Sequence, residues 1–123
     1  MDVRNASQST ATGTIVSELS REIVQFHARL CGRGPTKARS YVQGDFAMCA
    51  LEDIFTLAER TLIDSGAGPL VQESRQALLA ATHDDLVDLV ERVSSRPLRL
   101  LVSHVDAEAD FCLIVGFFER NGD

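Results

Sequence analysis

The sequence lacks several features that would assign it to a specialised class. It has no tryptophan, one tyrosine, three prolines and three cysteines in 123 residues. It has no run of apolar residues long enough to span a membrane, and its polar start lacks the basic and apolar segments of a secretory signal. With 45% hydrophobic and 24% charged residues, the composition is that of one globular domain. We therefore predict a cytoplasmic protein with no direct membrane insertion.

The sequence also has fewer basic residues than acidic ones. Lysine and arginine together number 12, against 18 aspartate and glutamate residues, which gives a formal net charge of −6. Proteins dedicated to binding nucleic acids carry an excess of positive charge, because they must neutralise phosphates. We therefore predict no nucleic-acid partner.

The cysteines do not form a recognisable motif. They are odd in number and widely spaced in apolar surroundings, and no CxxC pair occurs: Cys31, Cys49 and Cys112. In a cytoplasmic protein this pattern is typical of buried free thiols. The three histidines show no HxxxH or HExxH spacing. We predict no metal site, no cofactor and no catalytic residue, and the sequence leaves open whether the cysteines change redox state.

Hydrophobic periodicity predicts where the folded part begins. Residues 1–13 are polar and small, and we expect a disordered N-terminal tail there. From Thr14 the pattern changes, because apolar side chains recur every three or four residues, as in one face of a helix. We predict a helix over residues 15–31, which ends at Gly32 in a left-handed conformation.

Two β-hairpins are predicted by alternating or continuous apolar runs. The first joins strands 37–43 and 46–51 through the turn Gly44–Asp45. The second joins strands 98–105 and 111–118 through an acidic loop. Consecutive hairpins imply an antiparallel sheet.

Two further helices are expected between the hairpins. Thr56 and Glu59 have the spacing of a capping box, which predicts a short helix that ends near Gly66. A long apolar stripe predicts one helix over residues 69–94, about 39 Å in length at 1.5 Å per residue. This helix is longer than a four-stranded sheet needs as a cover, so we expect its overhang to contact a second subunit in a homodimer. Apolar residues of that overhang are Leu86, Leu89 and Val93.

The predicted order is therefore α-β-β-α-α-β-β, which is typical of the α+β class. We expect a four-stranded antiparallel sheet made of two hairpins, with the helices packed on one face.

The segment Gly32–Arg39 is the chemically most suggestive part of the sequence. It has three cations and two glycines in eight residues, although it does not have the GxxxxGK[ST] pattern of a P-loop. One interpretation is a small-anion or metabolite site in which the three cations converge and a hydroxyl assists; its residues would be Arg33, Thr36, Lys37 and Arg39.

The alternative interpretation of this segment is structural. Its glycines would make the turn, while Lys37 and Arg39 would lie on a solvated strand face. Their charges would then pair with Glu52 or Glu59, for less than about 1 kcal/mol each.

The sequence resembles a family of small bacterial and archaeal proteins. The resemblance rests on Ile23–Cys31 followed by GRGPTKARSYV, on the apolar strand that ends at Leu51-Glu52, on Thr56–Leu62, and on the spaced Val71 and Arg75. It covers residues 18–119 and is most specific in GRGPTKAR. The family is the MpsC-like domain of the sodium-translocating membrane-potential-generating system, formerly a domain of unknown function. It implies a single α+β domain over residues 14–120.

The resemblance also implies which residues act as a unit. The first recurring motif corresponds to Gly32, Arg33, Gly34, Pro35, Thr36, Lys37 and Arg39, and the second includes Glu59 and Arg60. The named system combines this domain with membrane proteins. Those proteins are linked to the movement of sodium and other cations, and to the supply of inorganic carbon in the form of bicarbonate. We expect a non-enzymatic accessory or regulatory module that acts through a protein partner, with a membrane protein as the candidate, and we keep the small-anion site as the alternative.

Overall fold

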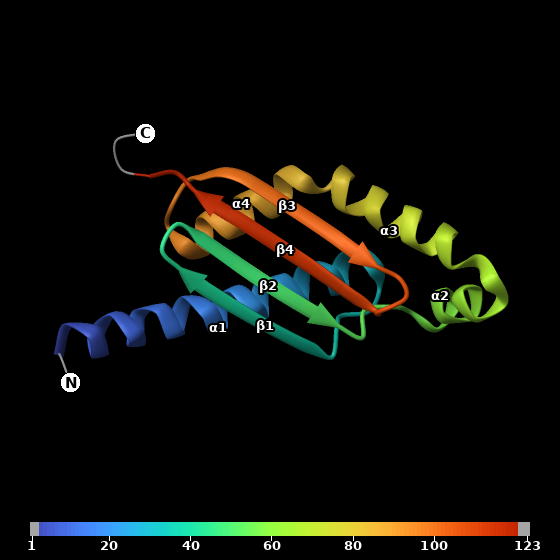
Figure 1. Ribbon diagram of the computed structural model, residues 1–123, viewed down its shortest axis with the longest axis horizontal. Coiled ribbons are helices and arrows are strands. Elements are labelled where there is room, and N and C mark those ends of the chain that lie inside the picture. Colours follow the sequence, from blue (N-terminus) through green and yellow to red (C-terminus); the bar gives the residue numbers. More distant parts are fainter. Residues whose placement is uncertain (1–2, 121–123) are drawn as a thin grey trace.

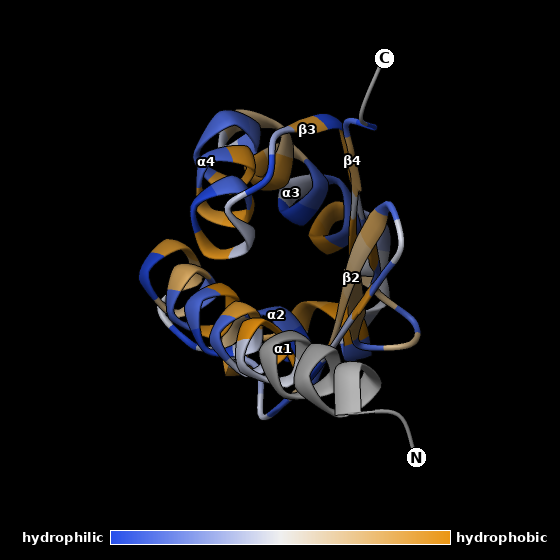
Figure 2. Ribbon diagram, turned by 90° about the vertical axis from the view of Figure 1, so that its left-hand side faces the viewer, coloured by the Kyte–Doolittle hydropathy of each residue, from blue (hydrophilic) through white to orange (hydrophobic). Residues whose placement is uncertain are grey.

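Four antiparallel strands form one sheet, and the long helices cover one of its two faces (Figures 1 and 2). The computed structural model describes the backbone of residues 3–120 and the side chains of residues 13–120. Its elements are α1 (Val3–Cys31), β1 (Lys37–Gln43), β2 (Phe46–Glu52), α2 (Leu57–Leu62), the π-helical turn η1 (Ile63–Ala67), α3 (Gly68–Ala81), α4 (His83–Ser94), β3 (Leu98–Asp106) and β4 (Phe111–Phe118). The predicted α+β class and the antiparallel sheet are confirmed.

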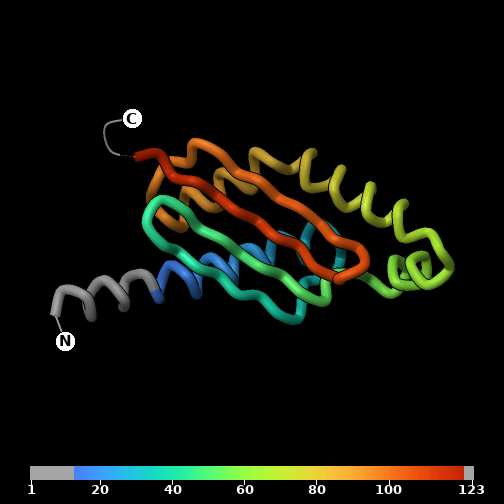
Figure 3. Tube along the Cα trace, viewed as in Figure 1, coloured from blue at the N-terminus to red at the C-terminus, as the bar shows by residue number. Residues whose placement is uncertain are grey.

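The strand order is β1-β2-β4-β3, so the two hairpins lie side by side and meet through β2 and β4 (Figure 3). Leu51 of β2 is opposite Cys112 of β4, and Ala47 is opposite Gly116. The predicted turn Gly44–Asp45 joins β1 to β2, and Gly44 has a φ of 59°, which glycine adopts without strain. α1 lies against β1, while α3 and α4 lie against β3.

Helix α1 begins at Val3 rather than at residue 15. The polar residues before Thr14 include alanine and no proline, so the helix can continue through them. The predicted disordered tail over residues 1–13 therefore overlaps a helical segment. Residues 1–2 and the side chains of residues 3–12 lie outside the described part. The predicted end of this helix is confirmed, since Gly32 has a φ of 81° and its N–H donates to the Ala28 carbonyl at 3.0 Å.

The prediction of one helix over residues 69–94 is wrong. The chain forms α3 and α4, which meet at Thr82, where φ is −108° and ψ is 16°. The Thr82 hydroxyl donates to the Leu78 carbonyl at 2.8 Å, and such a bond bends helices. Asp84 and Asp85 then fall in the first turn of α4, where the helix dipole favours negative charge.

The break at Thr82 removes the overhang on which the predicted dimer contact depended. The residues expected there are buried within the chain, with exposed fractions of 0%, 5% and 8%: Leu86, Leu89 and Val93. They belong to the core between the helices and the sheet. Other members of this core are Leu19, Ile23 and Phe26 of α1, Val71 and Leu79 of α3, and Cys49, Leu51, Cys112, Ile114 and Phe118 of the sheet.

Strand β3 contains one extra residue relative to β4. Leu98 is opposite Phe118, but Leu100 is opposite Phe117, so Arg99 forms a β-bulge. Leu98 packs over Gly116, where a Cβ would come within 2.9 Å of a Leu98 methyl carbon.

Helix side chains occupy the free edge of β3. Gln76 donates to the Ser103 carbonyl and accepts from the Val105 N–H, both at 3.0 Å. Gln72 donates to the Val105 carbonyl and accepts from the Ala107 N–H at 2.6 Å. Edge strands otherwise present unpaired backbone groups to other chains. This edge of the sheet is therefore closed to strand addition.

Candidate functional site

The Gly32–Arg39 turn carries the chain from α1 to β1 and is packed closely against α1. A Cβ on Gly34 would lie 3.4 Å from the Ala28 Cβ, from a Val24 methyl and from the Val24 carbonyl oxygen, which leaves little room for any side chain there. Pro35 follows and prevents helical continuation. The glycines and the proline thus place Arg33 and Thr36 beside the segment that follows β2.

Five side chains from separate parts of the chain form what we call the outer cluster: Arg33, Thr36, Asp53, Arg60 and Asp110. Asp53 lies at its centre. The Asp53 Oδ2 atom accepts hydrogen bonds from Arg33 Nη2 and from Thr36 Oγ1, both at 2.8 Å. Its Oδ1 atom accepts a hydrogen bond from Arg60, whose guanidinium also lies 3.7 Å from Asp110 Oδ2. The charged side chains of this cluster are between 32% and 44% exposed.

The outer cluster also holds the backbone that follows β2. Arg33 Nη1 donates to the carbonyl oxygens of Asp53 at 2.6 Å and Phe55 at 3.0 Å. From the other hairpin, Asp110 Oδ1 accepts from the N–H groups of Ile54 at 2.7 Å and Phe55 at 3.3 Å. Asp53 and Asp110 have φ values of 59° and 51°, a region that aspartate tolerates better than most residues. The backbone that follows β2 is therefore held from two sides, by Arg33 of the Gly32–Arg39 turn and by Asp110 of the loop between β3 and β4.

A second group of side chains, which we call the inner cluster, consists of Arg75, Glu59 and Cys31. Arg75 is 3% exposed and binds the Glu59 carboxylate through Nε and Nη2, both at 2.6 Å. It also donates to the Ile54 carbonyl at 2.7 Å and to Cys31 Sγ at 3.0 Å. Its guanidinium carbon lies 5.3 Å from the centre of the Phe55 ring. A planar two-point pair of this kind is among the stronger charge-assisted contacts.

Glu59 has two roles in this arrangement. The predicted capping box is confirmed, because the Glu59 N–H donates to Thr56 Oγ1 at 3.1 Å and the Thr56 N–H donates to Glu59 Oε1 at 2.9 Å. Burial alone would raise the pKa of Glu59, but the hydrogen bonds from Arg75 and Thr56 bring it below its usual value. The carboxylate therefore stays charged while it caps α2 and binds Arg75.

The buried thiols and the buried imidazole have shifted pKa values. Burial raises the pKa of Cys31, that of Cys49 to about 11 and that of Cys112 to about 12. Burial, assisted by the charge of Arg75, lowers the pKa of His27 to about 4. At neutral pH the thiols are protonated, which makes them weak nucleophiles, and the imidazole is uncharged.

Of the four residues predicted to bind an anion, two face the chain and two face outward. Arg33 and Thr36 are bonded to Asp53, whereas Lys37 and Arg39 are exposed on β1. The two cations line a hollow of about 470 Å³ together with Thr36, Ala38, Tyr41, Ala50 and Glu52. Glu52 is directly opposite Lys37 in the β1–β2 register. The four residues are thus divided between the outer cluster and the exposed surface, and the anion site stays a prediction.

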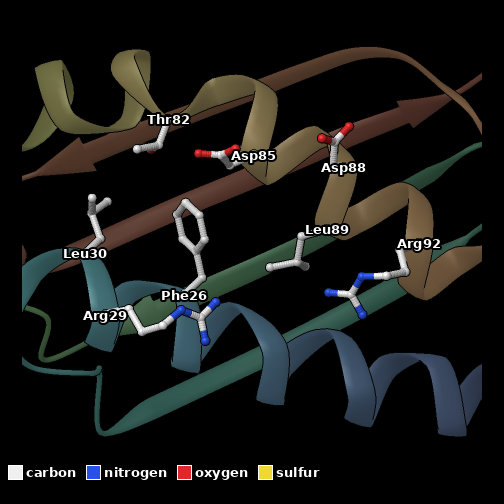
Figure 4. Close-up of a pocket in the computed structure, with 8 residues that line it drawn as sticks. All are labelled: Phe26, Arg29, Leu30, Thr82, Asp85, Asp88, Leu89 and Arg92. Carbon is white, nitrogen blue, oxygen red and sulfur yellow. The ribbon is translucent and has the colours of Figure 1, made fainter.

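A groove of about 460 Å³ runs between α1 and α4. Figure 4 shows Phe26 and Leu89 between the two helices, with Asp85 and Asp88 extending from α4. The remaining lining residues are Arg29, Leu30, Thr82 and Arg92. Both signs of charge line this groove, and one of its lining residues, Arg92 of α4, pairs with Glu22 of α1 at 3.2 Å.

The described part of the chain has neither a helix suited to span a membrane nor a group of side chains placed to bind a metal ion. Within residues 3–120, no helix combines the length and the apolar character needed to cross a membrane. Among the described side chains, no three histidine, cysteine, aspartate or glutamate residues are placed to hold a metal ion.

The family profile described as "Na+-translocating membrane potential-generating system (MpsC)" matches residues 11–120, which include both clusters and the whole sheet. The chain therefore belongs to the MpsC family. It is also similar to a Bacillus subtilis (strain 168) protein described as "Uncharacterized protein YbcI", with 26% identity over 88 residues that cover 71% of each chain. No solved structure matches the chain.

The two aspartates of the outer cluster, Asp53 and Asp110, are not among the predicted site residues. Asp53 is separated from Arg33 by 20 positions and Asp110 from Phe55 by 55, so no local spacing connects them. The available signal was the position of each aspartate next to a strand, where a short polar side chain can bond to backbone groups.

Proposed function

We propose that this protein is an accessory component of the sodium-translocating system named in its family description, and that it acts by binding a protein component of that system rather than by catalysis. The proposal extends to the link with inorganic-carbon supply that the family resemblance implies. It rests mainly on one observation: Arg33, Thr36 and Arg60 of the recurring motifs all bond to Asp53 within the chain. These polar groups stabilise the domain instead of facing a substrate.

The state of the nucleophilic groups supports the same proposal. Cys49 and Cys112 are buried, with pKa values raised to about 11 and about 12. Glu59 is bound at both carboxylate oxygens by Arg75. A general acid, base or nucleophile needs access to substrate and a pKa near the working pH.

The functional role can be tested in the native host. Cells that lack the gene are expected to lose sodium-dependent membrane potential, measured with a voltage-sensitive dye with and without bicarbonate. The wild-type gene should restore it, and so should versions in which each cysteine is replaced singly by alanine. An unchanged potential in the deletion strain would contradict a role in the system, and failure of a cysteine variant that folds normally would contradict a non-catalytic role.

The kind of partner can be tested with membranes. Purified protein should co-sediment with membrane vesicles from the host, and this binding should disappear when the vesicles are first treated with protease. Protein-free liposomes of the same lipids are the matched control. Equal binding to liposomes would show a direct lipid contact and would overturn the proposal of a protein partner.

A second candidate function is binding of a small anion at the outward-facing cations. Lys37 and Arg39 project from the same face of β1 beside a hollow of about 470 Å³, which is the observation that favours it. A specific anion would raise the melting temperature of the wild-type protein, since a ligand at a hundredfold excess over its Kd stabilises by about 2.7 kcal/mol. Phosphate, sulfate and bicarbonate would be compared, with Arg39→Gln as the control that should lose the shift. A flat panel would exclude these three ligands.

A further inference from the structure

The face of the sheet that the helices do not cover carries many apolar side chains. Figure 1 looks onto this face, and Figure 2 shows α1, α3 and α4 on the opposite side. Residues alternate between the two faces along each strand, and the exposed large side chains of this sheet include Tyr41 at 44%, Leu100 at 48% and Val102 at 49%. Strand β4 adds Phe111, Leu113, Val115 and Phe117, which are all only partly buried. We call this surface the open face.

An antiparallel sheet with one solvated face usually alternates apolar and polar residues. Strand β4 does not alternate, because its residues are apolar, apart from Gly116, on both faces. Continuous apolar strands are typical of sheets that are covered on both sides. Contiguous apolar patches on a protein surface mark sites of association. The open face therefore has the character of an association surface.

The strand register arranges the open face in four rows that cross the sheet. The first row is mostly charged, and consists of Lys37, Glu52, Phe111 and Asp106. The second consists of Arg39, Ala50, Leu113 and His104, and the third of Tyr41, Met48, Val115 and Val102. The fourth consists of Gln43, Phe46, Phe117 and Leu100, with the Arg99 guanidinium 5.5 Å from the Phe117 ring. Both carboxylates of these rows, Glu52 and Asp106, thus lie in the first row at one end of the sheet, whereas basic side chains also lie in the second and fourth rows.

The two outer strands carry opposite charges at that end. Lys37 is on β1 and Asp106 is on β3, at the two edges of the sheet and three strand spacings apart, about 14 Å. Neither forms an ion pair with any residue that the structure describes. Two copies stacked through their open faces, related by a twofold axis parallel to the strands, would bring β1 of each copy over β3 of the other. Lys37 would then lie over the partner's Asp106, twice in the dimer.

The same axis would match the apolar rows. Tyr41 would lie over the Val102 position of the second copy, and Met48 over the Val115 position, near the angle of about −30° at which stacked sheets pack. A twofold axis perpendicular to the strands would instead place Lys37 over Gln43 with no carboxylate opposite, and Tyr41 over Arg39. Glu52 does not distinguish the two axes, because it would lie over Phe111 with the first and over Phe46 with the second. Charge complementarity and apolar matching both favour the first arrangement.

We propose that the open face is the interface of a homodimer in which two sheets stack face to face, with Lys37 of each copy paired with Asp106 of the other. The inference goes beyond the proposed accessory function, since it names a second copy of this chain as the occupant of this surface. Strand addition at the β3 edge would not provide such a dimer, because Gln72 and Gln76 already occupy that edge.

The first test is the oligomeric state of the full chain, measured by sedimentation equilibrium over micromolar concentrations. The wild-type protein should be a dimer. Val102→Glu should be a monomer, because it places a charge over Tyr41 of the second copy, at a position of the open face that is half exposed in one copy. Leu70→Glu on α3 is the matched control, since Leu70 is exposed by 58% but lies away from the sheet, and it should remain a dimer. A wild-type monomer, or a dimer that Val102→Glu leaves intact, would overturn the proposal and leave the open face to a different protein.

The second test is a charge exchange, which does not depend on the folding of Val102→Glu. Lys37→Glu and Asp106→Lys should each weaken the dimer by at least tenfold in Kd. The double variant should recover most of the wild-type affinity, because each new glutamate would meet a new lysine across the interface. Within one copy the two positions are too far apart to compensate each other. If the double variant does not recover dimer affinity, the proposed orientation is overturned. The measurements of vesicle binding and of membrane potential test the accessory function independently of this result.

Discussion

The inner and outer clusters hold the same three residues of backbone, Asp53 to Phe55, in different environments. In the inner cluster one arginine, Arg75, makes four hydrogen bonds and is 3% exposed. In the outer cluster Asp53 divides its contacts among Arg33, Thr36 and Arg60, and the charged side chains are about one-third exposed or more.

This difference shows how the same pairing of arginine with carboxylate can have different energetic weight. Removing one partner of a buried pair leaves the other charge without water or counterion, which is costly. Removing one partner at the surface lets water replace it, so the loss is small. The inner cluster should therefore be essential to stability, and the outer cluster should tolerate loss of any one of its members.

The largest effect is expected for Arg75→Met. This change leaves Glu59 unpaired and removes the bonds to Ile54 and Cys31, so it should lower the free energy of unfolding by about 3–5 kcal/mol. The measurement is the urea midpoint by circular dichroism. Arg75→Lys keeps the charge without the two-point contact and should give an intermediate loss. A loss below about 1 kcal/mol for Arg75→Met would show that the inner cluster contributes no more to stability than the outer cluster.

The second largest effect is a pH dependence of stability caused by His27, whose pKa is lowered by burial and by the charge of Arg75 in the inner cluster. The pKa of His27 is lowered to about 4 in the folded chain, from an ordinary value of 6.5. Between these values the unfolded chain binds a proton that the folded chain does not, so stability is complete above pH 6.5 and falls as the pH drops towards 4. The loss should be about 3 kcal/mol over this window. In His27→Leu this part of the pH dependence should disappear when urea midpoints are compared at pH 7, 6, 5 and 4. Parallel curves for the two proteins would contradict the buried neutral imidazole.

A smaller effect is expected at the centre of the outer cluster. Asp53→Asn removes the charge that meets Arg33 and Arg60 but keeps a side chain that accepts a hydrogen bond and tolerates a φ of 59°. We expect a loss of about 1–2 kcal/mol in the free energy of unfolding. Asp53→Ala should lose more, because it adds backbone strain. Equal losses for the two variants would show that backbone conformation has no part in the role of Asp53.

The smallest effect is expected for Arg60→Ala, because Arg60 is 44% exposed. The loss should stay below about 1 kcal/mol and should shrink further in 1 M salt, which screens surface charges. The stability difference between wild type and Arg75→Lys should change little over the same salt range. A loss of stability in Arg60→Ala that does not depend on salt would show that Arg60 behaves like the buried residues of the inner cluster.

The secondary structure could be predicted from sequence where the signal is local. Both hairpins follow from short apolar runs with turn residues between them, and the Thr56–Glu59 capping box and the Gly32 helix end depend on neighbours within four residues. The division at Thr82 could not be predicted in this way, because the apolar stripe continues in phase from α3 into α4.

The candidate site was predicted only in part, for a related reason. The Gly32–Arg39 segment was identified, but its charges indicated a ligand because their partners are distant in sequence. Arg33 reaches Asp53, and Asp110 reaches the same backbone from the far hairpin. Only the strand order, with β2 next to β4, brings these segments together.

The bulge at Arg99 affects which changes in the sequence of β3 can be tolerated during evolution. Leu98 faces the helices against Gly116, and the extra residue lets Leu101 and Val105 face them as well. A substitution in this strand alters one position. Deletion of Arg99 would remove the bulge and leave the alternation from Leu100 onward unchanged. Deletion of one residue beyond the bulge, such as Val102, would instead shift the alternation by one, so that the buried and exposed sets of side chains exchange places from there onward. Members of this family should therefore differ freely in the composition of this strand but seldom in its length beyond the bulge.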